Sequence, residues 1–171
     1  MTKKFIVYII NLKKDEERKK NILRQVKKQK IKNYELIAAV DGNNLTEEEL
    51  NLLTYKNKKS INPWNTKMSP SQIGCALSHI KIYRKLIKSN YDFALILEDD
   101  AYFLRDLTEK LQNFITKNLK YKKQILLLSE LKEFISKPLD KFNDYEVVNV
   151  TNAFFTHSYF INKKAAESII K

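Results

Sequence analysis

The chain has 171 residues, of which 43% are hydrophobic and 30% are charged, and its formal net charge is +12. This length is enough for one domain with a substantial core, so we expect residues 1–171 to form a single domain. The one cysteine excludes internal disulfides and a cysteine-rich zinc site, the two histidines exclude a multi-histidine metal site, and the two glycines exclude a glycine-rich phosphate loop.

The first predicted element is a buried strand over residues 5–10. This run is apolar throughout and does not alternate, which is typical of a parallel strand that is covered on both faces. Asp15 is expected to cap the helix that follows. Within that helix Ile22, Leu23 and Val26 recur at helical spacing, and the remaining positions are mostly charged.

A second strand is predicted over residues 34–40, ending at the turn Asp41-Gly42. A short helix begins at Thr46, where glutamates follow in the pattern of a capping box. Residues 55–67 have no period and contain a proline, so we expect a loop there.

The rest of the chain continues the alternation of strands and helices. A helix opens at Ser69-Pro70, and residues 93–97 form another buried strand. The later expected elements are a helix over 106–119, a strand over 124–129, a pair of strands over 146–150 and 154–161, and a helix over 163–170. This alternation predicts an α/β fold with a mostly parallel central sheet flanked by helices.

Three consecutive carboxylates, Glu98-Asp99-Asp100, follow the strand at 93–97. In an open α/β sheet, ligands bind beyond the carboxyl ends of the strands. If the backbone stays extended, Glu98 and Asp100 point to one side and Asp99 to the other. Clustered carboxylates suit Mg²⁺ or Mn²⁺, which also bind substrate phosphates. The alternative is a solvated acidic loop, or a cap on the following helix.

Several short motifs, in this order, resemble glycosyltransferase family 25. The matching segments are 9–12 with Arg18, 39–42, 69–79 with its Gly-Cys-x-x-Ser-His pattern, 95–101, and 152–161 followed by 164–166. The resemblance implies a GT-A-like nucleotide-binding fold and an inverting transfer of a sugar, commonly galactose from UDP-galactose, to a lipid-linked or other glycan in lipooligosaccharide or lipopolysaccharide biosynthesis. Because family members usually continue further, it also implies that a C-terminal segment is lacking, which puts turnover in doubt more than donor binding.

The same resemblance implies roles for particular side chains. Asp100 is expected to bind Mn²⁺ or Mg²⁺ directly, with Asp99 sharing the metal or contacting the nucleoside, and Glu98 supporting the site. The remaining donor-binding candidates are Asn11, Arg18, Asp41, Ser78 and His79. The alternative for Asn11 is a polar residue at a strand end, and the alternative for Arg18 is a solvated charge on a helix. The alternative for Asp41 is a turn former before Gly42.

Two further questions stay open in the sequence. Cys75 and His79 lie four residues apart on one predicted helix face, and this arrangement suits either a metal pair or, more commonly, a histidine with satisfied ring nitrogens. An inverting transfer needs a general base near the acceptor hydroxyl. Asp41, His157 and Glu130 are candidates for it, without a specific warrant for any of them.

The positive charge predicts a partner with negative charge, or reflects nothing more than abundant lysine. The basic residues are mostly lysine, whereas nucleic-acid recognition favours arginine, so we expect peripheral contact with an anionic membrane rather than nucleic acid. No run approaches the length of a membrane span, and the N-terminal apolar run is too short for a signal peptide, so we expect a cytoplasmic protein. The alternatives to an active transferase are a donor-binding relative without turnover and a basic surface-binding protein.

Overall fold

The computed structural model describes residues 5–53, 68–104, 106–107, 109–118, 123–128, 137–143, 145–148 and 157–171. Within these ranges, no helix has both the length and the apolar character needed to cross a bilayer. The loop expected over residues 55–67 and the candidate base Glu130 lie outside the described ranges.

A five-stranded sheet forms the centre of the fold, in the order β2-β1-β3-β7-β4. Its strands are β1 (Phe5–Asn11), β2 (Tyr34–Ala38), β3 (Phe93–Glu98), β4 (Ile125–Leu127) and β7 (Ser158–Asn162). β1 pairs in parallel with β2 and β3, whereas β7 runs antiparallel between β3 and β4. Four strands therefore point the same way and one opposes them, which confirms the expected mostly parallel α/β sheet.

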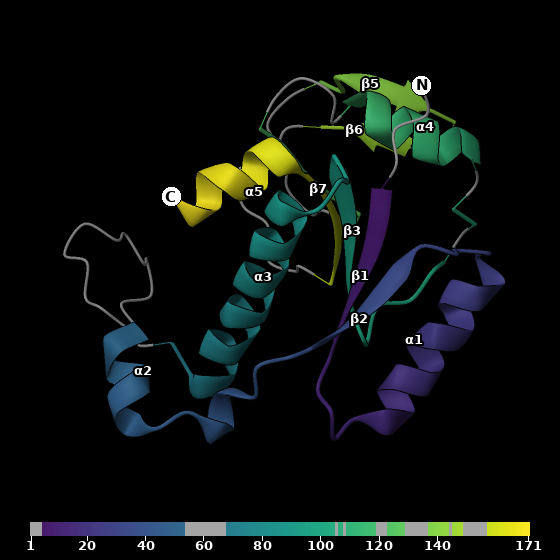
Figure 1. The fold of residues 1–171 in the computed structure, drawn as a ribbon. Coiled ribbons are helices and arrows are strands. Elements are labelled where there is room, and N and C mark those ends of the chain that lie inside the picture. Colours follow the sequence, from purple (N-terminus) through teal and green to yellow (C-terminus); the bar gives the residue numbers. More distant parts are fainter. Residues whose placement is uncertain are drawn as a thin grey trace.

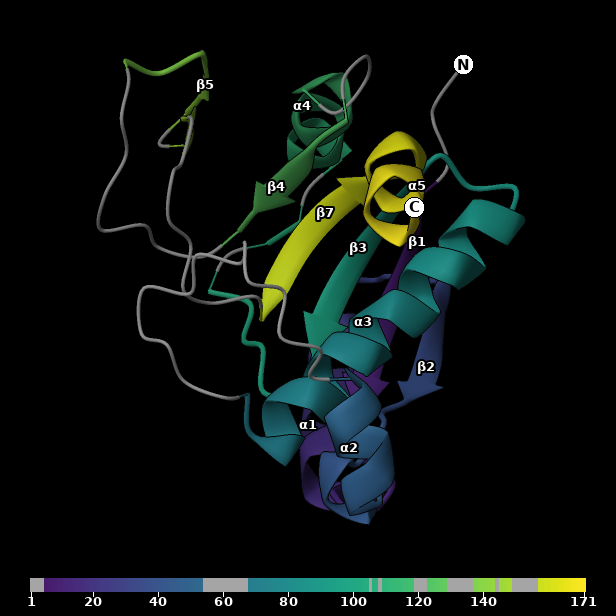
Figure 2. The ribbon, with the colours of Figure 1, turned by 90° about the vertical axis from the view of Figure 1, so that its left-hand side faces the viewer.

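Helices cover both faces of this sheet (Figures 1 and 2). One face packs against α1 (Glu16–Lys28) and α4 (Glu109–Asn118), and the other against α3 (Pro70–Lys88) and α5 (Lys163–Ile170). A 3₁₀ turn, η1 (Gly42–Asn44), and the short helix α2 (Glu47–Leu53) lie between β2 and α3 along the chain. The layering explains why the strands read as continuous apolar runs.

Side chains of β1 alternate between two hydrophobic cores. Ile6, Tyr8 and Ile10 belong to the core under α3 and α5, while Val7 and Ile9 belong to the core under α1 and α4. All five are buried, and Val7 and Ile9 are completely inaccessible. Because both faces of the strand are covered, an apolar side chain is favoured at every position, so the period of two disappears from the sequence.

Helix α3 begins as its sequence predicts. The Ser69 hydroxyl accepts a hydrogen bond from the backbone N–H of Gln72, and the Gln72 side chain accepts one from the backbone N–H of Ser69. Pro70 occupies the first turn, where its missing N–H has no intrahelical partner to lose. This reciprocal cap fixes where α3 starts, and therefore where its first turn stands beside the end of β2.

Both glycines of the chain lie where α3 approaches the segment after β2. A Cβ on Gly74 would stand 2.5 Å from the carbonyl oxygen of Val40 and 2.6 Å from the backbone nitrogen of Gly42. A Cβ on Gly42 would stand 1.7 Å from the carbonyl oxygen of Pro70. Backbone contacts this close leave no room for a side chain, so the two glycines let α3 and η1 touch.

The pairing expected for the two late strand segments is wrong. β6 (Tyr145–Val147) pairs with β5 (Asp140–Phe142) in a separate two-stranded ribbon, and β7 pairs with β3 and β4. The apolar pattern of residues 154–161 identifies a strand but does not name its partner. Four of the five β7 residues are buried. The backbone N–H and C=O groups of a buried strand need hydrogen-bond partners on both sides, and a single neighbouring strand such as β6 would pair only one side.

Candidate functional site

The carboxyl ends of three parallel strands meet at one edge of the sheet, and each brings polar residues there. Asn11 ends β1, Asp41 follows β2, and residues 98–100 end and follow β3. β7 runs the other way, so its amino end places His157 at the same edge, where its carbonyl oxygen accepts a hydrogen bond from the Glu98 N–H at 2.8 Å. β2 and β3 flank β1, so a topological switch point lies between β1 and β3, where open α/β sheets bind ligands.

A cleft opens at this edge, with an empty volume of about 640 Å³ that is partly open to solvent. The cleft brings together seven of the side chains that the sequence singled out, namely Arg18, Asp41, Ser78, His79, Glu98, Asp99 and Asp100. Residues separated by more than 80 positions in the chain therefore surround one space.

Asp99 is buried and its two carboxylate oxygens have different partners. The Asn11 side-chain amide donates to one oxygen at 2.7 Å, and the Arg18 guanidinium approaches the other at 3.4 Å. Asn11 also donates to the carbonyl oxygen of Asp15 at 3.1 Å, which ties the end of β1 to the start of α1. Asn11 and Asp99 are each 7% exposed, so Asn11 lies behind the cleft and acts on it through Asp99.

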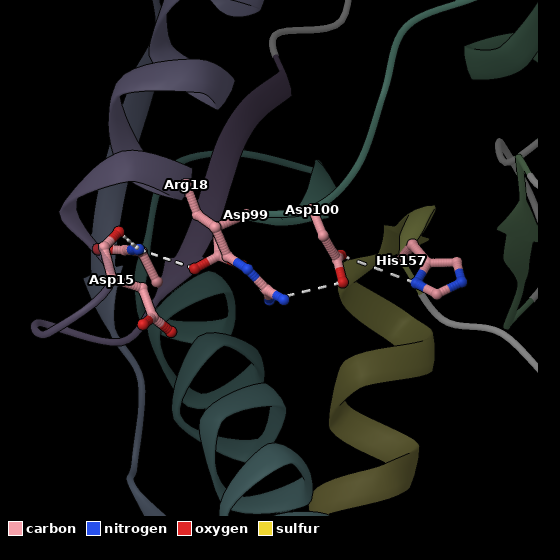
Figure 3. Close-up of polar contacts among 6 residues, drawn as sticks. Asp15, Arg18, Asp99, Asp100 and His157 are labelled. Atoms are coloured by element: carbon pink, nitrogen blue, oxygen red, sulfur yellow. Dashed lines mark hydrogen bonds and ion pairs between the residues drawn. The ribbon is translucent and has the colours of Figure 1, made fainter.

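Asp100 faces solvent at the mouth of the cleft and lies between two nitrogen-bearing side chains (Figure 3). One of its oxygens is 3.8 Å from the Arg18 guanidinium, and the other is 3.8 Å from Nδ1 of His157. A ligand atom from each of Glu98, Asp100 and His157 lies within 4.8 Å of the others. The carboxylate oxygens suit Mn²⁺ or Mg²⁺, and the added imidazole fits Mn²⁺ better than Mg²⁺, which takes oxygen ligands.

His79 is buried beside the cleft, and its two ring nitrogens have different surroundings. Nδ1 lies 2.6 Å from the Tyr159 hydroxyl, which lies 2.7 Å from the Tyr83 hydroxyl. Nε2 lies 3.4 Å from a Glu98 oxygen, within ion-pair distance, but within the described part of the chain it forms no hydrogen bond. Burial lowers the pKa of His79, but the interactions with Cys75 and Glu98 outweigh it and raise this pKa to about 9.

Asp41 stabilises the turn that follows β2. Its side chain accepts a hydrogen bond from the Asn43 backbone N–H at 3.1 Å and pairs with the Lys14 ammonium at 2.6 Å. The hydrogen bond from Lys14 lowers the pKa of Asp41, with a further contribution from the Asn43 N–H. A carboxylate with a lowered pKa is a weaker base, so this geometry favours the turn-forming alternative for Asp41.

Ser78 is completely buried, and both hydrogen-bonding functions of its hydroxyl are used within the protein. It donates to the Gly74 carbonyl oxygen at 2.7 Å and accepts from the Val40 backbone N–H at 2.9 Å. The second bond crosses from α3 to the segment after β2. Ser78 therefore supports the cleft wall that Gly42 and Gly74 also bring together.

Sequence reasoning missed the two tyrosines behind His79. Tyr83 lies four residues after His79 on α3, so helical spacing alone places it on the same face. Tyr159 comes from β7, and no local pattern points from it to His79. The burial of three polar side chains in one hydrogen-bonded chain raises the pKa of Tyr159 far above its usual range, chiefly by desolvation, so this tyrosine stays protonated.

The comparisons with known proteins agree with one another. The family model described as "Glycosyltransferase family 25 (LPS biosynthesis protein)" matches residues 5–171. The human procollagen galactosyltransferase 2 is 24% identical over 178 residues, covering 96% of this chain and 27% of the relative. The procollagen lysyl hydroxylase and glycosyltransferase of Acanthamoeba polyphaga mimivirus is 28% identical over 180 residues, covering 95% of this chain and 19% of the relative.

A glycosyltransferase 25 family member of Aedes aegypti is 31% identical over 99 residues, which cover 57% of this chain and 16% of the relative. The chain thus spans less than a third of the length of these three curated relatives. The family match extends over all of the central sheet and includes every described residue of the cleft.

Proposed function

Because the chain belongs to glycosyltransferase family 25, we propose that it transfers a sugar from a UDP-sugar donor to a hydroxyl of a glycan acceptor. Galactose is the sugar proposed, since relatives are named as procollagen galactosyltransferases. A lipid-linked acceptor in lipooligosaccharide or lipopolysaccharide biosynthesis is proposed from the description of the family. The observation that carries the proposal is the meeting of Asn11, Asp99 and Asp100 at the switch point between β1 and β3.

The proposed donor site divides the acidic cluster into two parts. Asp99, held by Asn11 and Arg18, gives a fixed negative charge deep in the cleft, where it can accept hydrogen bonds from a ribose. Asp100 and His157 hold Mn²⁺ or Mg²⁺ at the mouth, with Glu98 beside them. When bound, the cation stabilises the negative charge on the departing nucleoside diphosphate.

Arg18 has a second part in this proposal. Its guanidinium approaches both Asp99 and Asp100, and its side chain is 58% exposed at the cleft. It is therefore free to turn toward a diphosphate while staying anchored by Asp99, and a guanidinium suits phosphate oxygens by shape and charge. Of the three candidates for the general base, Asp41 pairs with Lys14, and His157 is assigned here to the cation. Glu130 lies outside the described residues, so no general base is assigned.

The proposal is tested by calorimetry of UDP binding with and without Mn²⁺, followed by release of UDP from a panel of UDP-sugars. One charge-assisted contact contributes about 1.5–3 kcal/mol, so Mn²⁺ is expected to strengthen UDP binding about ten- to a hundredfold. UDP-galactose is expected to release UDP fastest in the presence of a glycan acceptor. UDP binding that ignores Mn²⁺ contradicts the proposed site, while metal-dependent binding without release identifies a donor-binding module that lacks turnover.

The proposal includes a cytoplasmic location with peripheral contact on an anionic membrane. The net charge of +12 supports the membrane contact, because each lysine or arginine near such a surface contributes about 1 kcal/mol of attraction. The protein is expected to sediment with vesicles containing phosphatidylserine and to be released by about 0.5 M salt, which screens the attraction. Equal sedimentation with neutral phosphatidylcholine vesicles, or a preference for duplex DNA over anionic vesicles, contradicts this part.

A further inference from the structure

A second group of metal-ligating side chains lies on the α3 side of the cleft. Cys75 and His79 stand one turn apart on α3, and Glu98 ends β3 directly opposite them. One ligand atom from each, the Cys75 sulfur, a His79 ring nitrogen and a Glu98 oxygen, lies within 4.8 Å of the other two. The chain spacing supplies only the first two of these, and the packing of α3 on the sheet adds the third.

The buried imidazole provides the independent observation that a ligand belongs here. The His79 side chain is only 9% exposed, and its Nε2 forms no hydrogen bond with any of the residues that the structure describes, although a Glu98 oxygen lies within ion-pair distance. A buried polar atom left unsatisfied costs about 1–3 kcal/mol, so native proteins rarely keep one without a use for it. Nε2 faces Glu98 at 3.4 Å, which is the direction in which the cluster lies.

The other ring nitrogen is held as metal-binding histidines are held. Nδ1 lies 2.6 Å from the Tyr159 hydroxyl, and Tyr159 lies 2.7 Å from the Tyr83 hydroxyl. A partner on one ring nitrogen fixes the orientation of the ring and leaves the other nitrogen for the metal. The two tyrosines come from α3 and β7, so the ring is fixed by two separate elements.

We propose that Cys75, His79 and Glu98 form a three-ligand site for zinc. A thiolate, an imidazole and a carboxylate are the ligands that zinc takes in proteins, whereas manganese and magnesium avoid thiolate. Three protein ligands leave a fourth tetrahedral position open. All three residues line the cleft, so that position faces the space in which a donor substrate is proposed to bind.

This site is distinct from the one proposed at Asp100 and does not depend on it. Only Glu98 is common to both groups of ligand atoms. Zinc loading therefore engages the carboxylate that stands beside the hard cation, so the zinc site is measured without manganese or nucleotide. Since zinc displaces protons from the thiol and the imidazole, its affinity is expected to rise with pH.

The test uses Co²⁺ as a spectroscopic substitute for zinc on the full chain, with a reductant that contains no thiol. One equivalent of Co²⁺ is expected to give an intense thiolate-to-cobalt band in the near ultraviolet and visible bands typical of tetrahedral cobalt, and zinc is expected to remove both. Cys75→Ser is expected to abolish the thiolate band. His79→Gln is expected to weaken Co²⁺ binding at least about a hundredfold, because it removes a direct ligand.

A second variant covers the case in which His79→Gln does not fold. Tyr159→Phe removes only the hydroxyl at Nδ1 and is expected to weaken Co²⁺ binding about ten- to a hundredfold. Asp100→Asn is the matched control, and it is expected to keep the thiolate band even where it abolishes the effect of Mn²⁺ on UDP binding. Absence of the thiolate band in the unaltered chain overturns the zinc site, and so does a band that survives Cys75→Ser or disappears in Asp100→Asn.

Discussion

Replacing Asp100 by Asn is expected to lower Mn²⁺-dependent release of UDP by about a thousandfold. The amide keeps the size of the side chain but loses the negative charge that lies 3.8 Å from both Arg18 and His157. A cation at a departing diphosphate contributes several kcal/mol to the transition state, and each 1.4 kcal/mol corresponds to a tenfold change in rate. The measurement is the rate of UDP release as a function of Mn²⁺ concentration.

The control for this substitution lies at the other end of β3. Asp92→Asn changes an exposed carboxylate just before β3, at the opposite edge of the sheet, and is expected to leave both the rate and its Mn²⁺ dependence unchanged. The 44% exposure of the Asp100 side chain makes a loss of folding an improbable cause, and thermal unfolding of the variant checks this directly. If Asp100→Asn keeps the unaltered Mn²⁺ dependence, Asp100 does not bind the cation.

Replacing Gly74 by Ala is expected to lower the free energy of unfolding by about 2 kcal/mol, although alanine is the better helix former. In an isolated helix the same change stabilises by about 1 kcal/mol. Here the new Cβ would stand 2.5 Å from the Val40 carbonyl oxygen and 2.6 Å from the Gly42 nitrogen. Overpacking costs about 1–3 kcal/mol, and the upper end of that range applies because backbone atoms cannot rotate away as a flexible side chain can. Subtracting the gain of about 1 kcal/mol in helix propensity leaves the expected net loss of about 2 kcal/mol.

Urea denaturation of the Gly74→Ala variant measures this loss, and Arg84→Ala serves as its control. Arg84 is an exposed position of the same helix, so its replacement is expected to change the free energy of unfolding by less than about 0.5 kcal/mol. The Gly74 variant is also expected to bind UDP more weakly, because the wall carrying Asp41 is pushed away from α3. A variant of Gly74 that is more stable than the unaltered protein contradicts the close approach of α3 to η1.

Much of the local structure was predictable because it depends on neighbours in the chain. The apolar run at 5–10 became β1, the run at 93–97 became β3, and the helix expected to open at Ser69-Pro70 became α3. Each of these signals is a local balance of burial and backbone hydrogen bonding, which a short stretch of residues settles by itself. The expected helix over 106–119 was likewise found, as α4 over Glu109–Asn118.

The candidate site was predictable only in part. The sequence predicted a ligand site at the acidic cluster because Glu98, Asp99 and Asp100 end or follow a buried strand, and ligands bind at the carboxyl ends of the strands in a parallel sheet. The different environments of the two aspartates were not predictable. Asp99 is buried against Asn11, which ends β1, whereas Asp100 is exposed beside His157, which directly precedes β7.

The sequence by itself determined the kind of fold, the positions of most elements and the strand whose end carries the acidic cluster, because hydrophobic periodicity and end signals act over a few residues. Only the tertiary structure decided that β7 enters the sheet between β3 and β4, since a strand's pattern says that it is buried but not which strand it joins. That insertion brings His157 to Asp100 and Tyr159 to His79. Contacts between distant residues arise from global packing, which no local period records.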